Sequence, residues 1–192
     1  MKALAKTAFL LAALLLAGCG PGGGKPWHMT DISGAMPDLA FHMTRATDGA
    51  AVTGRDYRGQ IVLLYFGYTH CPDVCPATLA NLADILDRVG QKDVRVLFVT
   101  VDPDRDTVPV LKQYTAAFSP RIDGLVGSKE EIAKLARRYR IAYSVTVGPP
   151  YTVTHSSAVF VFDREGRARL VTTSTDDAAG IAGDVTRLLR QQ

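Results

Sequence analysis

The stretch YFGYTHCPDVCPATLAN, residues 65–81, decides the fold, because a buried strand ends in it and a helix begins in it. The apolar run at 61–66 is typical of a strand that is covered on both faces. Apolar residues then recur at helical spacing over 77–89. Cys71 and Cys75 lie at the junction. Unpaired N–H groups at a helix start stabilise a thiolate, so both cysteines are candidates for chemistry rather than packing.

The segments that follow this junction alternate between strand and helix patterns. The predicted strands are 94–101, 153–163 and 167–173, and the predicted helices are 107–118, 128–139 and 176–190. The last two strands flank a short turn and predict an antiparallel hairpin. This order predicts an α/β fold with a central mixed sheet flanked by helices. It is similar to the thioredoxin fold.

Pro72 and Pro76 restrict how the junction is built, since proline inside a helix removes a donor and clashes with the preceding turn. We therefore expect residues 71–75 to form a tight loop and Pro76 to be the first helical residue. Both sulfurs would then lie near the helix N-terminus. They would be close enough to form a disulfide when oxidised, or to hold one metal ion between two thiolates.

The N-terminus has the pattern of an exported protein. Residues 1–18 contain two lysines, no acid and a short apolar run. That run is shorter than the about 20 residues of a membrane-spanning helix, so these residues are predicted to be a signal peptide. Residues 16–19 read LAGC and resemble a bacterial lipobox, which predicts lipidation of Cys19. Ordinary secretory cleavage is the alternative.

Three parts of the chain are therefore predicted: a lipoprotein signal peptide at 1–18, a lipidated flexible tether at 19–35 and one domain at 36–192. The protein would be anchored to a bacterial cell membrane through its lipid and would face the periplasm or the outer side. Thiols there are not kept reduced by a cytoplasmic glutathione pool. Without residues 1–18 the chain carries 20 basic and 19 acidic residues. This balance and the lack of a basic run predict no nucleic-acid partner.

Two thiolates make an incomplete metal site, so the four histidines are the next candidates. His28 lies in the predicted tether, His42 precedes the core strands, and His70 would have to fold back on its own loop. His155 lies at the entrance to the predicted hairpin. In a thioredoxin-like fold that entrance faces the strand-to-helix junction. His155 is therefore the candidate third ligand, against the alternative of a surface or hydrogen-bonded histidine.

Three motifs together carry a resemblance to a known family. GYTHCPDVCP at 67–76, VDPDRDT at 101–107 and HSS at 155–157 resemble, in order and spacing, the SCO/SenC family of copper proteins. The resemblance covers about 36–189. It implies a thioredoxin fold that binds copper, as Cu(I) or Cu(II). By position, the implied metal ligands are Cys71, Cys75 and His155. The chain departs from the family at Thr154, where many members have an acidic residue.

The resemblance also implies a function. The expected role is that of a membrane-tethered copper chaperone, which helps to assemble the binuclear copper centre of cytochrome c oxidase subunit II. A second periplasmic copper carrier or a thiol reductant would be a further partner. Two soft thiolates and an imidazole suit Cu(I), and the same set holds Cu(II) with one further ligand. A structural zinc site would want a fourth protein ligand, for which the sequence offers no candidate.

Enzymatic alternatives remain open at this stage. The pair Cys71 and Cys75 would also serve a thiol-disulfide reductase that keeps the copper-site cysteines of the oxidase reduced, although the usual spacing in such enzymes is CxxC. Residues 74–76 are superficially similar to the nucleophile segment of a thiol peroxidase. The segment 102–107 is interpreted as a turn that ends a strand and caps a helix, with direct metal contact as the alternative.

Overall fold

The structure is a computed structural model that describes residues 26–191. The predicted signal peptide, the predicted lipidation of Cys19 and the first part of the predicted tether lie outside the described residues. None of the helices in the described range is both long and apolar enough to span a membrane.

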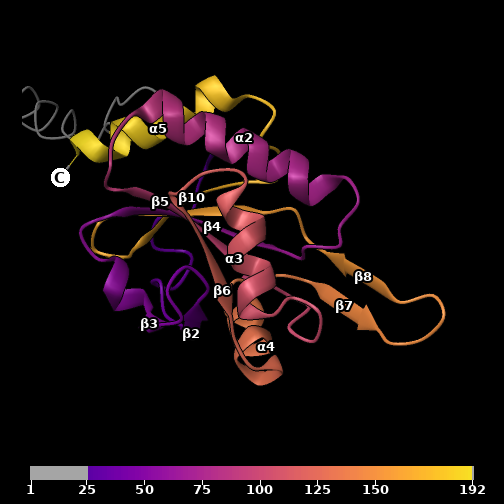
Figure 1. Ribbon diagram of the computed structural model, residues 1–192. Helices are drawn as coiled ribbons and strands as arrows, with labels where there is room; N and C mark the ends of the chain where they lie inside the picture. Colours follow the sequence, from indigo (N-terminus) through magenta and orange to yellow (C-terminus); the bar gives the residue numbers. More distant parts are fainter. Residues whose placement is uncertain (1–25, 192) are drawn as a thin grey trace, which may run out of the picture.

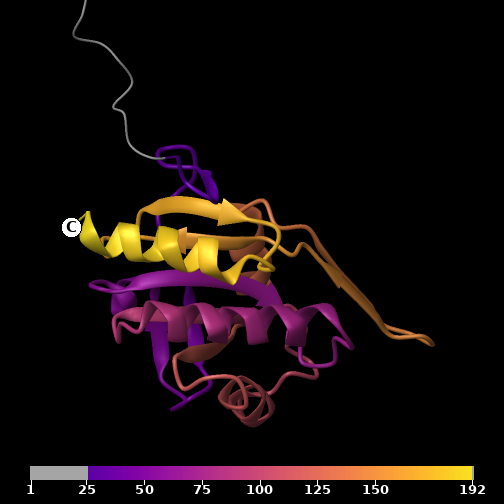
Figure 2. The same ribbon diagram turned by 90° about the horizontal axis from the view of Figure 1, so that it is seen from above.

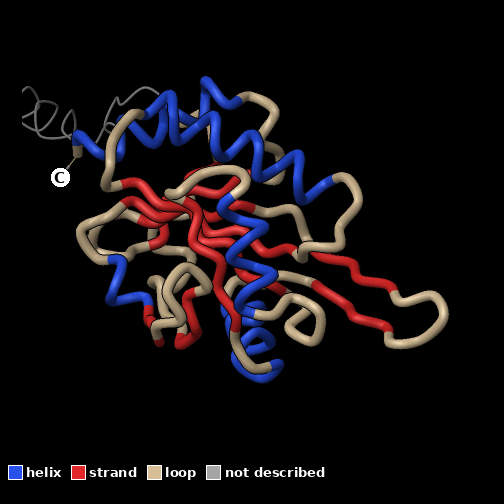
Figure 3. Tube along the Cα trace, viewed as in Figure 1, coloured by secondary structure: helices blue, strands red, loops and turns tan. Residues whose placement is uncertain are grey.

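A mixed eight-stranded sheet forms the centre of the molecule, with helices on both faces (Figures 1 and 3). The strand order is β1-β10-β9-β4-β5-β6-β2-β3. Neighbours β4, β5 and β6 are parallel, whereas β9 runs antiparallel to β4. These strands are β1 (Thr30–Asp31), β2 (His42–Arg45), β3 (Ala51–Thr53), β4 (Ile61–Gly67), β5 (Val94–Thr100), β6 (Ile122–Val126), β9 (Val159–Phe162) and β10 (Ala168–Thr172). The predicted central mixed sheet is confirmed.

The helices are η1 (Gly54–Tyr57), α2 (Val74–Val89), α3 (Val108–Ala116), α4 (Lys129–Arg138) and α5 (Ala178–Arg190). All seven residues of β4 are buried. Leu63 and Tyr65 belong to the core layer beneath α2, α3 and α5, while Leu64 and Phe66 belong to the layer beneath α4. Figure 2 shows α2 and α5 side by side. A strand that is covered in this way needs the continuous apolar sequence that β4 has.

The start of α2 differs from the prediction. The helix begins at Val74, so Pro76 is its third residue and not its first. Proline is tolerated there because the first four N–H groups of a helix have no partner within the helix. The N–H of Ala77 already bonds to the carbonyl of Asp73, at 3.2 Å. As a result, Cys75 lies in the first turn of α2 and only Cys71 lies in the preceding loop.

The predicted strand at 153–163 is two strands. Its first part is β8 (Thr152–His155), which pairs with β7 (Tyr143–Thr146) in a separate two-stranded sheet. This hairpin projects from the body of the molecule (Figures 1 and 2). Its second part is β9, which pairs with β10 as predicted. The sequence changes where the strand divides: β8 alternates apolar and polar residues and is half exposed, whereas β9 is continuously apolar and buried.

The described end of the predicted tether is part of the domain. β1 pairs with β10, and the N–H of Met29 donates to the buried carboxylate of Asp184 at 2.7 Å. The guanidinium of Arg187 lies 3.8 Å from the centre of the Trp27 ring. The prediction of a tether as far as residue 35 is therefore wrong over 27–35, where apolar and polar contacts hold the chain on the sheet edge and on α5.

Candidate metal centre

Two sulfurs and one imidazole meet where the central sheet ends. Cys71 lies in the loop after β4, Cys75 in the first turn of α2, and His155 at the end of β8. The two Sγ atoms and one ring nitrogen of His155 all lie within 4.8 Å of one another. Cys75 is buried, and the other two side chains are half-buried. The structure thus brings together the three residues that the sequence singled out.

Gly67, the last residue of β4, makes room for this arrangement. A Cβ atom at this position would lie 2.5 Å from the ring of Phe98 and 3.0 Å from Cys75 Sγ. The first distance is one that real Cβ atoms essentially never show, and the second is tighter than most Cβ contacts. The absence of a side chain at Gly67 therefore lets the sulfur of Cys75 pack directly against the end of the central strand.

The environment of Cys71 favours its thiolate. Partial burial opposes ionisation, but hydrogen bonds from the backbone N–H groups of Cys75 and Asp73 and from the Tyr68 hydroxyl outweigh it, so the pKa of Cys71 is lowered. The N–H of Cys75 lies 3.3 Å from Cys71 Sγ. This donor belongs to the first turn of α2, so the helix start stabilises the thiolate as the sequence predicts.

Cys75 and His155 form a neutral pair. Cys75 Sγ lies 3.1 Å from His155 Nε2, and His155 Nδ1 lies 2.9 Å from the carbonyl oxygen of Ser156. A carbonyl only accepts, so Nδ1 carries the proton and Nε2 accepts from the thiol. Burial raises the pKa of Cys75 to about 12 and lowers the pKa of His155. The Ser156 carbonyl therefore orients the ring of His155. Orientation of this ring does not require an acidic residue at position 154, where this chain has Thr154.

Aromatic rings border His155 on two sides. The rings of Tyr65 and Tyr68 approach it edge-on, with centroids at 5.9 and 5.8 Å. A pocket of about 310 Å³ opens in front of the site, between the loop after β4 and β8. Val74, which lines this pocket, is 51% exposed. The site is therefore walled on the side of the sheet and open on the side of the loop.

Asp106 holds the loop that carries Cys71. Its buried carboxylate accepts from the N–H and the hydroxyl of Thr69, at 2.9 and 2.6 Å, and from the hydroxyl of Thr100 at 2.6 Å. The segment 102–107 does form a turn, and Thr107 is the N-cap residue of α3, although its side chain makes no capping bond. Its carboxylates do not belong to the group of metal-ligand atoms.

A second set of contacts from the same segment fixes the hairpin. The buried carboxylate of Asp102 accepts from Arg105 Nε at 2.5 Å and from the Tyr151 hydroxyl at 2.7 Å. The guanidinium of Arg105 lies 3.9 Å from the centre of the Tyr151 ring. We call these three residues the hairpin clasp. Sequence reasoning missed the clasp, and its signal was the charged turn together with a tyrosine directly after two prolines.

The other histidines lie elsewhere. His28 is near Asp177 at 3.5 Å, and His42 is near Glu131 at 3.2 Å. His70 is exposed and lies 3.7 Å from Asp106. None of the three shares a cluster of potential metal ligands within the described range. Their exclusion by sequence reasoning agrees with these positions.

Solved structures share this fold over most of the chain. A structure of Arabidopsis thaliana ScoI with copper bound is 36% identical, with a TM-score of 0.74 and coverage of 81% of this chain and 99% of the other. A structure of Bradyrhizobium japonicum ScoI with copper bound is 35% identical, with a TM-score of 0.71 and coverage of 79% and 98%. The thioredoxin-like fold is therefore confirmed.

The sequence comparisons agree. The mitochondrial SCO2 homologue of Bos taurus is 46% identical over 120 residues, which are 58% of this chain and 44% of that protein. The chain thus spans less than half the length of this relative. The family model described as SCO1/SenC matches residues 35–190. On this match, the chain belongs to the SCO1/SenC family.

Proposed function

We propose that this protein binds copper through Cys71, Cys75 and His155 and delivers it during assembly of cytochrome c oxidase. The observation that carries the proposal is the preformed group of two sulfurs and one unprotonated imidazole nitrogen within 4.8 Å. Two soft thiolates and an imidazole are the donors that copper favours, and no fourth residue joins them in the described structure to complete a structural zinc site. The copper-bound relatives support the choice of metal.

The three ligands would be prepared differently for the metal. Cys71 supplies a sulfur with a lowered pKa at the open side of the site. Cys75 must lose its proton, and the ring nitrogen that it contacts is the nearest acceptor. Binding would therefore release protons, as it does whenever a thiol becomes a ligand. His155 keeps its orientation through the Ser156 carbonyl and presents Nε2 toward the sulfurs.

Copper binding to the reduced protein under anaerobic conditions tests the ligand set. We expect one tightly bound copper in the wild type and a loss of affinity of about 100-fold or more in Cys71→Ala, Cys75→Ala and His155→Ala. His70→Ala is the matched control, because this histidine is adjacent to Cys71 but outside the ligand group. Wild-type affinity in all three ligand variants would refute the assignment.

The acceptor is proposed to be cytochrome c oxidase subunit II. The basis is the family resemblance, which implies assembly of the binuclear copper centre in that subunit. A soluble copper domain of subunit II should gain copper from the loaded protein and not from the loaded Cys71→Ala variant. If copper passes to the subunit at the same rate from free solution, the chaperone role fails while the binding site stands.

The N-terminal end of the chain would hold the protein at the membrane through a lipid on Cys19. The sequence pattern at 1–19 supports a cleaved signal peptide and lipidation of Cys19. Mass spectrometry of the protein from cell membranes should find a lipidated cysteine as the first residue. An unmodified Cys19, or a chain that still begins at Met1, would contradict this part of the proposal.

A thiol-disulfide reductase is the second candidate, and the unequal cysteines favour it. The Cys71 thiolate would attack a partner disulfide and form a mixed disulfide. Cys75, after giving its proton to His155, would then attack the Cys71 sulfur of the mixed disulfide and release the partner. The two electrons come from the Cys71 and Cys75 sulfurs, which are oxidised to a disulfide, and the two partner sulfurs leave as thiolates that take up protons from water and from His155. Reduction of an oxidised subunit II peptide at a rate that depends on both cysteines would support it, and absence of such turnover would remove it.

A further inference from the structure

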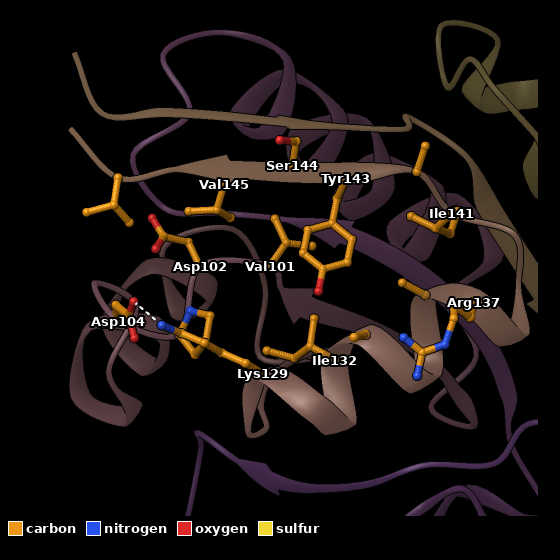
Figure 4. Close-up of a pocket in the computed structure, with 15 residues that line it drawn as sticks. Val101, Asp102, Asp104, Lys129, Ile132, Arg137, Ile141, Tyr143, Ser144 and Val145 are labelled. Atoms are coloured by element: carbon orange, nitrogen blue, oxygen red, sulfur yellow. Dashed lines mark ion pairs between the residues drawn. The ribbon is translucent and has the colours of Figure 1, made fainter. Parts of the chain in front are cut away.

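The hairpin β7–β8 stands between two pockets. The pocket in front of the metal centre is lined by β8, and a larger one, of about 540 Å³, is lined by β7 and α4. Figure 4 shows Tyr143 and Val145 of β7 pointing into the larger pocket and Ile132 of α4 pointing up from the opposite side. This volume lies in the range of pockets that bind small ligands, so it has room for a few side chains of a partner.

The strand that borders this pocket has an open edge. Ser156 N–H donates to the carbonyl of Ala142, which lies directly opposite it. Bonded and non-bonded pairs alternate along an antiparallel ladder, so the backbone groups of Tyr143 and Val145 point away from β8. The bond from Tyr68 to the carbonyl of Val153, opposite Val145, shows the same alternation on β8.

No partner satisfies these outward groups within the described chain. β7 pairs with β8 only, and no other backbone hydrogen bond involves Tyr143 or Val145. Proteins usually protect an edge strand with lysine, proline or a covering segment. The sequence of β7 is YSVT, which contains none of these residues. The edge can therefore accept another strand.

The charges around the pocket favour an acidic partner. At one end, Lys129 is paired with Asp104 at 2.6 Å. The carboxylate of Asp102 is already engaged by the hairpin clasp. At the other end, the exposed Arg137 makes no ion pair with any residue in the described range, so the unmatched charge is positive. Val147, which follows β7 and also lines the pocket, is 75% exposed and adds apolar surface that a partner could cover.

We propose that β7 is a docking strand for an extended segment of a partner protein. The segment would pair with the outward N–H and C=O groups of Tyr143 and Val145, place alternate apolar side chains in the pocket, and set an acidic side chain against Arg137. Addition of a strand to an open sheet edge is a common mode of peptide recognition. Tyr143 lies directly opposite His155, so the segment would be held one strand away from the metal centre. This docking does not require copper.

A random peptide display library, panned on the reduced protein and counter-selected on the Arg137→Glu variant, tests the proposal. Recovered peptides should alternate apolar residues and carry an acidic residue. In NMR titrations they should shift the Tyr143 and Val145 amides and slow their solvent exchange. Arg137→Glu should weaken binding by about tenfold, and methylation of the peptide nitrogens that face β7 should do the same.

Lys134→Glu is the matched control. This substitution makes the same charge change at another exposed position of α4, but Lys134 does not line the pocket. Its peptide affinity should match that of the wild type, and Arg137→Glu should still bind copper normally. The proposal is overturned if no peptide survives counter-selection, if the shifted amides lie away from β7, or if methylated peptides bind as well as unmethylated ones.

Discussion

The two sulfurs of the site differ in protonation because they differ in burial and in the donors around them. Cys71 is half-exposed and receives backbone N–H groups, whereas Cys75 is fully buried and donates its own proton to His155. A site with two thiolates in place before the metal would carry two negative charges close together. The observed arrangement avoids this repulsion, and the second proton leaves only when a metal or a sulfur partner replaces it.

This difference predicts selective alkylation. At neutral pH iodoacetamide should modify Cys71 well before Cys75 in the metal-free protein, because the thiolate is the reactive form. The rate at Cys71 falls as pH falls through its pKa. Because that pKa is lowered, half of the maximal rate should be reached at a lower pH than for an unperturbed cysteine thiol. Mass spectrometry of peptides over a pH series measures both rates.

The variant Tyr68→Phe tests whether hydrogen bonds to the sulfur of Cys71 lower its pKa. The Tyr68 hydroxyl is one of the donors that lower the pKa of Cys71, so its removal should move the half-maximal point to higher pH. Equal alkylation of the two cysteines, or a pH profile that Tyr68→Phe leaves in place, would show that these hydrogen bonds do not control the thiolate.

At the scale of elements, the loops after β4 and β5 depend on each other through Asp106. Asp106→Asn replaces a carboxylate that accepts three hydrogen bonds with a group that has one accepting oxygen. We expect a loss of about 3 kcal/mol in the free energy of unfolding and weaker copper binding, because the Cys71 loop loses its anchor. Urea unfolding of the reduced protein measures the first effect.

Asp104→Asn is the control within the same turn. Its carboxylate is half-exposed and pairs with an exposed lysine, so water replaces the lost contact easily. Stability close to that of the wild type is expected. If the two variants unfold at the same urea concentration, Asp106 does not hold the loop in the way that its contacts indicate.

The hairpin clasp predicts a graded response at Tyr151. Tyr151→Phe loses the bond to Asp102 but keeps the ring against Arg105, and Tyr151→Ala loses both. Hydrogen exchange of the β7–β8 amides should therefore accelerate modestly in the first variant and strongly in the second, while amides of β4 and β5 stay protected. Copper should leave the loaded protein faster in the same order. Unchanged exchange in Tyr151→Ala would contradict the clasp.

Long elements with one clear pattern could be predicted from the sequence, and short ones could not. The apolar run of β4 and the capped helix α4 are specified by their own residues. The four-residue strand β7 has no pattern that separates it from a loop, because four half-exposed residues are too few to show a period. His155 was found because the fold type places the hairpin entrance near the cysteines. Its ring orientation depends on a backbone carbonyl, which no side-chain pattern reveals.

At the scale of the whole molecule, the first described segment, with β1, covers one edge of the sheet and contacts the C-terminal helix α5. β1 lies beside β10, and Met29 and Trp27 contact α5. The tether was predicted because residues 20–25 have no periodic apolar pattern, and it was extended to residue 35. The contacts that order it are made with residues more than 130 positions away. Such long-range pairing is determined by the finished sheet edge and not by local preference.

This covered edge predicts that the ordered domain starts before the first residue of the family match. A chain that begins at residue 36 should be less stable than one that begins at residue 26 by about 3–5 kcal/mol. Two effects add up in this loss. The apolar surface that Met29 covers becomes exposed to water, and the buried carboxylate of Asp184 loses the hydrogen bond from the Met29 N–H. Thermal unfolding of the two reduced chains compares them directly.

The variant Asp184→Asn serves as a control. In the longer chain it should reproduce part of the loss in the free energy of unfolding. In the shorter chain it should lower that free energy less, because the N–H donor of Met29 is already gone. Equal stability of the two chains would instead mean that residues 26–35 only rest on the domain, and that the flexible tether extends as far as the sequence alone predicts.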